Sequence, residues 1–239
     1  LKKLDEKFKY LDLTKNISHK GKTLYEDVYQ SSKTQDGAIS AYLLNEGIIP
    51  PNKDPNPIVK KNYAGGYLFC PKTGIFNYMF DEDLTSLYPS IIMSLNIGRE
   101  TLIGRIVTSD DRDNRLALND LKEMDQNKEF EIENLKRQVK VMTVKEIISL
   151  IEKHNLAITA NGTMFRTDKP STLSVVLAKW FDERVEYKNA MKKAYKSGDK
   201  AGGDLNHLRQ YTMKILLNSL YGATALPSFR YGSVLLSEG

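Results

Sequence analysis

Two long helical stretches near the C-terminal end of the sequence constrain the fold most strongly. They cover residues 172–196 and 205–220. The eight residues between them include three glycines and two aspartates, a composition that favours a turn. A connection this short leaves room only for antiparallel neighbours, so the sequence predicts a helical hairpin.

Shorter helical patterns occur elsewhere in the chain. From Thr23 to Glu46, apolar residues recur at helical intervals, which predicts one or two helices with a break near Asp36-Gly37 and an end at Gly47. Residues 144–154 also predict a short helix. Helices therefore occupy both ends of the chain.

The middle of the chain has a different character. Residues 67–70 and 75–80 are β-branched and aromatic around a tight turn, which predicts two strands, the second leading straight to Asp83. Before them, Ile48 to Pro57 contains four prolines and predicts an extended connector between two structural units. Residues 99–140 are charged and irregular, which indicates an elaboration without regular structure.

Composition bounds the class of protein. A chain of 239 residues with 41% hydrophobic content can bury a core and is long enough for one large or two small domains. A net charge of +5 weakly favours a polyanionic partner. The single cysteine, Cys70, excludes an internal disulfide and no segment approaches the ~20 apolar residues of a membrane span, so we expect a cytoplasmic protein without a membrane partner.

The residues around Asp83 could bind a metal ion beside a phosphate. A strand would bring the Asp83 carboxylate to its end, and Ser86 with Pro89 would open a helix over residues 90–95. A carboxylate there can hold Mg²⁺, and the free amides of the helix start can take triphosphate oxygens. The alternative is that Asp83 caps a turn while Tyr88 packs in a core. Asp81 would share the face of Asp83.

Polar stripes on the helical hairpin form the second candidate. On the first helix Arg184 and Lys188 are four residues apart and lie on one face, which Lys192 extends. On the second helix Lys214, Asn218 and Tyr221 are separated by four and three residues and also lie on one face. Gly222 leaves space beside the tyrosine. The alternative is that these cations are solvated, as single lysines on exposed helices usually are.

Taken as whole strings, these motifs resemble those of family B DNA polymerases. Residues 83–92, DLTSLYPSII, resemble the family's motif A, and residues 214–222, KILLNSLYG, are similar to its motif B. Residues 181–188 resemble the partner helix of the family's fingers, and Tyr63-Ala64-Gly65-Gly66 resembles its Tyr-x-Gly-Gly element. The continuation Asn96-Ile97 and Glu100-Thr101 is similar to the tailed-phage replicative branch.

The resemblance implies roles for the motif A residues. Asp83 would bind both catalytic metal ions, and Leu84 would offer its carbonyl to one of them. The backbone amides of Ser86, Leu87 and Tyr88 would hold the triphosphate. The ring of Tyr88 would collide with a 2′-hydroxyl and so act as a steric gate against ribonucleotides.

The resemblance also implies roles for the fingers and the connector. Arg184, Lys188 and Lys214 would neutralise the β- and γ-phosphates of the incoming nucleotide. Asn218 and Tyr221 would shape the pocket of the nascent base pair. The expected DNA contacts are at Tyr63, Gly65, Gly66, Tyr221 and Gly222.

The implied activity is DNA-directed DNA synthesis in phage replication, in the cytoplasm of a bacterial host. Deoxynucleoside triphosphates, primer–template DNA and two Mg²⁺ ions would take part, with the remainder of a polymerase in cis or in trans and a sliding clamp as a further candidate partner. The family's Asp-Thr-Asp motif C, which completes the metal site, would follow Gly239, so we expect a fragment cut at both ends that is inactive alone.

Three alternatives stay open from sequence. Residues 108–141 exceed the length expected for the phage replicative branch, so a protein-primed enzyme with an insertion competes with an RNA-primed one. A non-catalytic DNA-binding remnant would use the same cations without chemistry. An RNA-synthesising or reverse-transcribing enzyme would want a small residue in place of Tyr88.

We therefore predict an α+β fold that comprises an incomplete palm on a mostly antiparallel sheet, two-helix fingers and a helical N-terminal remnant. The expected divisions are an exonuclease remnant at 1–48, a connector at 49–62, a palm with motif A at 63–107, an insertion at 108–169, fingers at 170–222, and a return toward the palm at 223–239.

Overall fold

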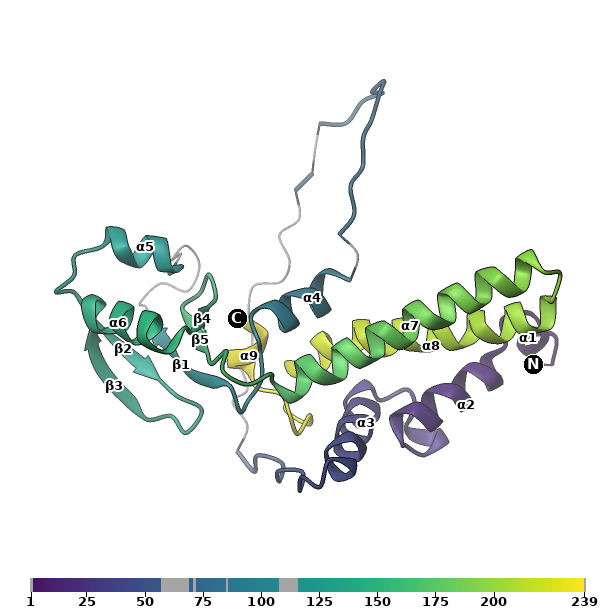
Figure 1. The fold of residues 1–239 in the computed structure, drawn as a ribbon, viewed down its shortest axis with the longest axis horizontal. Coiled ribbons are helices and arrows are strands. Elements are labelled where there is room, and N and C mark those ends of the chain that lie inside the picture. The colour runs from purple at the N-terminus through teal and green to yellow at the C-terminus, as the bar shows by residue number, and fades with distance from the viewer. Residues whose placement is uncertain (1, 57–68, 71, 85, 108–115, 239) are drawn as a thin grey trace.

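The protein has an α+β fold, as the sequence predicts. The structure, a computed structural model, describes residues 2–56, 69–70, 72–84, 86–107 and 116–238. A helical hairpin forms one arm of the molecule and a five-stranded antiparallel sheet lies at the opposite end, and the N-terminal helices lie beside the hairpin (Figure 1). The described helices include none long and apolar enough to cross a membrane.

The hairpin consists of α7 (Thr172–Lys196) and α8 (Lys200–Thr224). The bounds of α7 agree with the prediction, but α8 begins five residues earlier than expected and includes two of the three glycines of the predicted turn, Gly202 and Gly203. Asp199 caps the helix by accepting a hydrogen bond of 2.9 Å from the amide of Gly202. A Cβ on Gly203 would lie 2.3 Å from the Tyr195 ring, so this glycine serves close packing between the helices rather than a turn.

Three helices and a 3₁₀ turn precede the connector and pack beside the hairpin. They are α1 (Lys2–Phe8), α2 (Tyr10–Gly21), η1 (Tyr25–Asp27) and α3 (Ser31–Asn45). The predicted break near Asp36-Gly37 is wrong, because α3 runs through these residues without interruption. Gly37 instead permits a close approach to the end of α2, since a Cβ there would lie 2.2 Å from the carbonyl oxygen of Gly21.

Two polar contacts join these helices to the hairpin. Lys20 of α2 forms an ion pair with Glu183 of α7. Gln35 of α3 is fully buried and donates from Nε2 to the Leu216 carbonyl at 2.8 Å and to the Ser219 hydroxyl at 2.7 Å, both on α8. The N-terminal helices are thus fixed against the helical hairpin.

The sheet corrects the interpretation of residues 99–140 as irregular. Its strands are β1 (Leu102–Val107), β2 (Glu129–Glu133), β3 (Val139–Thr143), β4 (Ala157–Ile158) and β5 (Thr163–Phe165), in the order β3-β2-β1-β5-β4. Every pair is antiparallel, as expected for the fold. Alternation of charged and apolar residues in β2 was a short signal within a strongly charged region, and sequence reading missed it.

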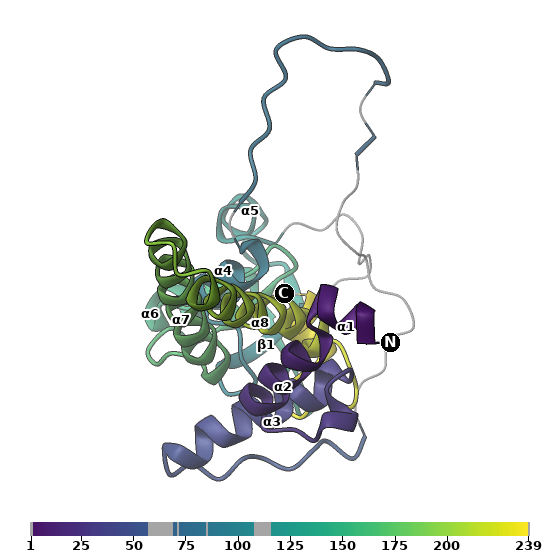
Figure 2. The same cartoon turned by 90° about the vertical axis from the view of Figure 1, so that its right-hand side faces the viewer.

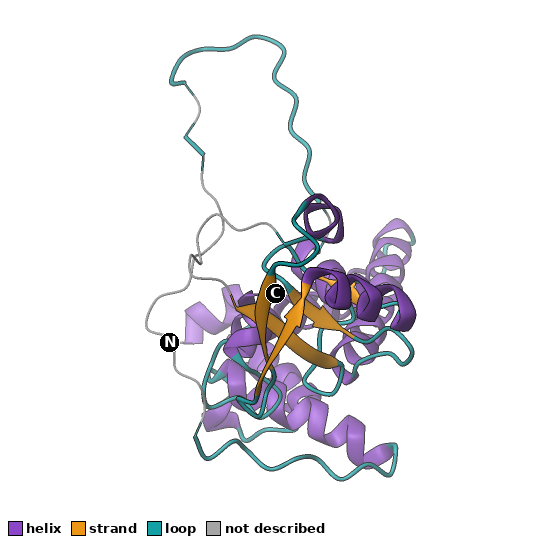
Figure 3. Cartoon of the chain, turned by 90° about the vertical axis from the view of Figure 1, so that its left-hand side faces the viewer, coloured by secondary structure: helices purple, strands orange, loops and turns teal. Residues whose placement is uncertain are grey.

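Two helices pack with this sheet around their own core (Figure 3). They are α5 (Leu118–Glu123) and α6 (Val144–His154), the second with the predicted bounds. Ile106, Leu121, Ile147 and Met164 are fully buried in this core. Thr143 and Glu146 form a capping box at the start of α6, which explains why its beginning could be predicted.

The predicted strands at 67–70 and 75–80 are wrong for the residues that the structure describes. Residues 69–70 and 72–84 are in neither a helix nor a strand and extend away from the body of the molecule (Figures 1 and 2). Ile75, Tyr78 and Phe80 are at least 83% exposed. Strand propensity is satisfied only by a neighbouring strand, and no described segment pairs with this one.

Candidate nucleotide-binding site

Helix α4 (Leu87–Ser94) begins within the predicted motif A. Ser86 precedes it in a left-handed conformation, with φ of 56°, so the chain turns sharply as it enters the helix. Pro89 and Ile92 are buried and fix α4 against α7 and α8. The helix starts three residues earlier than predicted, and the first amides of a helix have no acceptor within it.

A ring stack joins motif A to motif B. The rings of Tyr88 and Tyr221 are nearly parallel, with centroids 4.4 Å apart and an interplanar angle of 12°. The hydroxyl of Tyr221 also donates to the Ser237 carbonyl at 3.3 Å. Residues 133 positions apart in sequence thus form one aromatic surface, and Tyr88 remains 45% exposed beside it.

A hydrogen bond joins motif A to the first helix of the hairpin. Arg184 of α7 donates from Nη1 to the Ser86 hydroxyl at 3.3 Å. Its Nε is buried and has no hydrogen-bond partner among the described residues. A buried guanidinium N–H without an acceptor is costly.

The remaining predicted nucleotide contacts are less closely assembled. Lys188 and Lys214 are exposed, as is Asn218. No described residue forms an ion pair with either lysine. A Cβ on Gly222 would meet open space, so within the described chain this glycine packs against nothing. Tyr63, Gly65 and Gly66 lie outside the described residues.

The predicted metal ligands do not form a complete site. Asp83 and Leu84 lie on the exposed segment before α4, and the strand expected to hold Asp83 is absent from the described residues. No group of three or more His, Cys, Asp or Glu side chains among the residues described is arranged to hold a metal ion. Asp83 can supply one ligand to Mg²⁺, and further ligands would have to come from elsewhere.

Sequence reading missed a buried residue that supports the site. Asn96, in the left-handed conformation just after α4, donates from Nδ2 to the carbonyls of Arg166 at 2.6 Å and Lys169 at 2.7 Å. Its Oδ1 accepts from the amide of Ser171, the N-cap of α7, at 2.6 Å. The end of α4 is therefore fixed to the start of the fingers-like arm. An asparagine after a helix is only a weak signal, because it is also common in turns.

Comparison with known proteins shows the family to which the chain belongs. The sequence profile of DNA polymerase family B matches residues 27–235. The chain belongs to DNA polymerase family B. Its sequence is 25% identical over 199 residues to the DNA-directed DNA polymerase of Escherichia phage RB69, an alignment that covers 82% of the chain and 18% of that protein. The polymerase of Enterobacteria phage T4 is 35% identical over 96 residues, which cover 40% of the chain and 10% of that protein.

The family extends beyond phages. The DNA polymerase of Orf virus is 26% identical over 195 residues, or 81% of the chain and 17% of that protein. The structure of the family B DNA polymerase from Pyrobaculum calidifontis matches the fold with a TM-score of 0.60 at 17% identity, covering 98% of the chain and 25% of that structure. The chain therefore spans roughly a fifth of the length of its curated relatives.

Proposed function

We propose that this family B chain forms the nucleotide-selecting part of a DNA-directed DNA polymerase of the tailed-phage replicative type. The observation that carries the proposal is the junction of motif A with both helices of the hairpin. Tyr88 stacks on Tyr221, and Ser86 binds Arg184. These two contacts join motif A to an aromatic ring of α8 and to a guanidinium group of α7.

This junction suits an incoming deoxynucleoside triphosphate. Arg184 would offer its guanidinium group to a phosphate oxygen, and the first amides of α4 would take others. Lys188 and Lys214 form no ion pair with a described carboxylate, so a phosphate could bind them without displacing one. They would add positive charge as pyrophosphate leaves. The exposed edge of the Tyr88 ring would exclude a ribose 2′-hydroxyl by contact.

Mg²⁺ would supply the electrostatic activation of the primer hydroxyl and of the triphosphate. Asp83 and the Leu84 carbonyl are the ligands that we propose from this chain, and the rest of the polymerase would complete the set. The proposed divisions follow the sequence prediction. These divisions assign residues 1–48 to the end of an exonuclease domain and 170–222 to the fingers. Among the proposed DNA contacts, the template would be touched by Tyr63, Gly65 and Gly66. The nascent base pair would be contacted by Asn218, Tyr221 and Gly222.

The experiment measures single-nucleotide addition to a primer–template by the polymerase that contains this chain, whether as one polypeptide or assembled from two. We expect Arg184→Ala to lower kcat/KM for dNTP by about 10- to 100-fold, because a hydrogen bond to a charged group contributes ~1.5–3 kcal/mol. Lys193→Ala, which removes an exposed cation near the end of α7, is the matched control. Undiminished addition by alanine variants of Arg184, Lys188 and Lys214 would refute the proposal.

The steric-gate role has a separate readout. Tyr88→Val removes the ring and should raise the ratio of ribonucleotide to deoxynucleotide addition at least tenfold, while Tyr221→Phe keeps the stack and should leave the ratio unchanged. Unaltered discrimination in Tyr88→Val would contradict the gate. A DNA-binding remnant without chemistry would show neither addition nor any dependence on Tyr88.

A further inference from the structure

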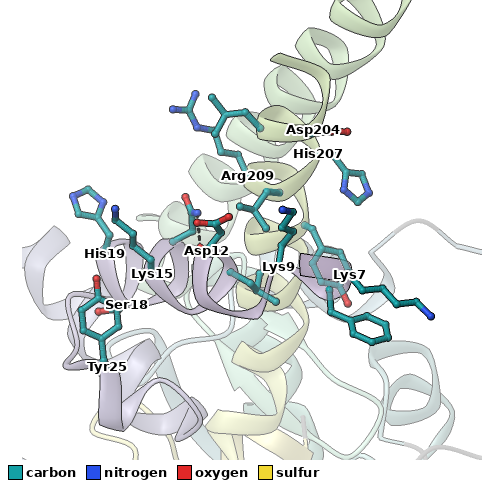
Figure 4. A pocket seen from close by; sticks show the side chains of 16 residues that line it. Lys7, Lys9, Asp12, Lys15, Ser18, His19, Tyr25, Asp204, His207 and Arg209 are labelled. Carbon is teal, nitrogen blue, oxygen red and sulfur yellow. Dashed lines mark hydrogen bonds between the residues drawn. The ribbon is translucent and has the colours of Figure 1, made fainter. Parts of the chain in front are cut away.

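A groove outside the nucleotide site runs between the N-terminal helices and the outer half of α8. Its volume is about 1070 Å³. Residues from α1 and α2 form one wall, and residues 204–211 of α8 form the other (Figure 4). The groove is therefore built from segments nearly 200 residues apart in sequence.

Positive charge predominates in the groove. Lys7, Lys9, Lys15 and Arg209 line it and are exposed, and none of them forms an ion pair with any residue that the structure describes. Of the two carboxylates in the lining, Asp12 and Asp204, the second already accepts the hydroxyl of Tyr195 at 2.7 Å, which raises the pKa of that tyrosine.

Aromatic rings are interleaved with these cations. Phe8, Tyr25 and Tyr211 line the groove and are between 42% and 60% exposed. His207 stacks in parallel on Tyr211 with ring centroids 6.4 Å apart. A solvated lysine face has no need of exposed rings, whereas single-stranded nucleic acid requires cations for its phosphates and flat rings for its bases.

The position of the groove connects it with the nucleotide site. His207, Tyr211, Lys214, Asn218 and Tyr221 follow one another at intervals of four, three, four and three residues, so they lie in one stripe along α8. With ~1.5 Å rise per residue, the stripe extends roughly 20 Å from the groove to the Tyr88–Tyr221 stack. A strand that left the stack along this stripe would enter the groove.

We propose that this groove binds single-stranded DNA, with phosphates at Lys7, Lys9 and Lys15 and a base stacked on Tyr211. The identification of the strand as unpaired DNA near the nucleotide site rests on the proposed function. The binding surface itself depends only on the charge and the rings of the groove. An acidic protein segment would use the same cations but would gain nothing from Tyr211.

The test is fluorescence anisotropy of a labelled 20-nucleotide oligo(dT) with the 239-residue chain, at 50 to 200 mM salt. The triple variant with Lys7→Gln, Lys9→Gln and Lys15→Gln should bind oligo(dT) at least tenfold more weakly at 50 mM salt. It should also reduce the slope of log affinity against log salt by about 2, since each contact to a single strand contributes about 0.7. The control carries Lys193→Gln, Lys196→Gln and Lys200→Gln, which remove the same charge from exposed residues outside the groove.

The ring is tested separately. Tyr211→Ala should weaken oligo(dT) about tenfold through lost stacking and leave the affinity for heparin unchanged. Equal binding by the groove and control triple variants would overturn the proposal, as would polyglutamate that competes as well as oligo(dT) of equal charge. If the groove variants lose oligo(dT) while polymerases carrying Arg184→Ala, Lys188→Ala or Lys214→Ala all add nucleotides normally, the groove proposal is supported and the proposed function fails. If the groove variants bind oligo(dT) normally while the polymerase variants lose nucleotide addition, the groove proposal alone is overturned.

Discussion

Gly37 offers a stability test in which two opposing effects can be separated. It lies in the interior of α3, where alanine would normally stabilise a helix by about 1 kcal/mol. In this protein the new Cβ would lie 2.2 Å from the Gly21 carbonyl oxygen and 3.1 Å from that of Lys22. The first separation is more than 1 Å shorter than an ordinary carbon–oxygen contact of ~3.3 Å.

The clash is with backbone, which no rotamer change can relieve, so α2 and α3 must move apart. Overpacking of this kind costs about 1–3 kcal/mol, and the size of the overlap favours the upper end of that range. After subtraction of the helix-propensity gain, Gly37→Ala should lower the free energy of unfolding by about 2 kcal/mol.

The assay is urea unfolding of the 239-residue chain, followed by far-ultraviolet circular dichroism. Gly222→Ala is the control, because Gly222 is also helical but a Cβ there meets nothing within 4 Å. That variant should be stabilised by up to ~0.8 kcal/mol, less if the last turn of α8 frays. Equal stabilisation by the two substitutions would refute the argument that Gly37 is required for close helix packing.

Three further predictions follow from the contacts described above. Hydrogen bonds from Thr143 lower the pKa of Glu146, so Glu146→Gln should lower the free energy of unfolding at neutral pH. The stability that ionised Glu146 contributes is lost as the pH falls through its lowered pKa. In urea titrations the difference between variant and parent should therefore shrink below about pH 4.5. Gln35→Glu should lower the free energy of unfolding by about 3 kcal/mol, since it would bury a negative charge against the Leu216 carbonyl. Gln35→Leu introduces no charge and should lower it by only about 1 kcal/mol. Equal losses for the two variants in urea titrations would contradict this reason. The 239-residue chain alone should add no nucleotide to a primer with Mg²⁺ present, because its described residues hold no complete metal site; measurable extension in a gel assay would show otherwise.

Local signals in the sequence were sufficient for the elements that stabilise themselves. Helix α7 and helix α6 have the predicted bounds, and each begins at a side-chain cap within its own sequence, Ser171 for α7 and Thr143 for α6. The family motifs likewise predicted one site for Ser86, Tyr88, Arg184 and Tyr221, and the folded chain brings Ser86 to Arg184 and Tyr88 to Tyr221. Such strings carry their information in residue identity and order, which do not depend on a partner.

Tertiary structure decided the rest. Gly37 and Gly203 were expected to interrupt helices, yet each lies inside a helix, and a neighbouring segment occupies the space where its Cβ would be. Residues 75–80 have strand propensity without a described partner strand, whereas β2 lies within a charged segment and forms a strand because β1 and β3 flank it. The sequence by itself determined the family and predicted which residues would form the proposed nucleotide site. Only the folded chain decided which of those residues touch, because burial and pairing depend on segments far apart in sequence.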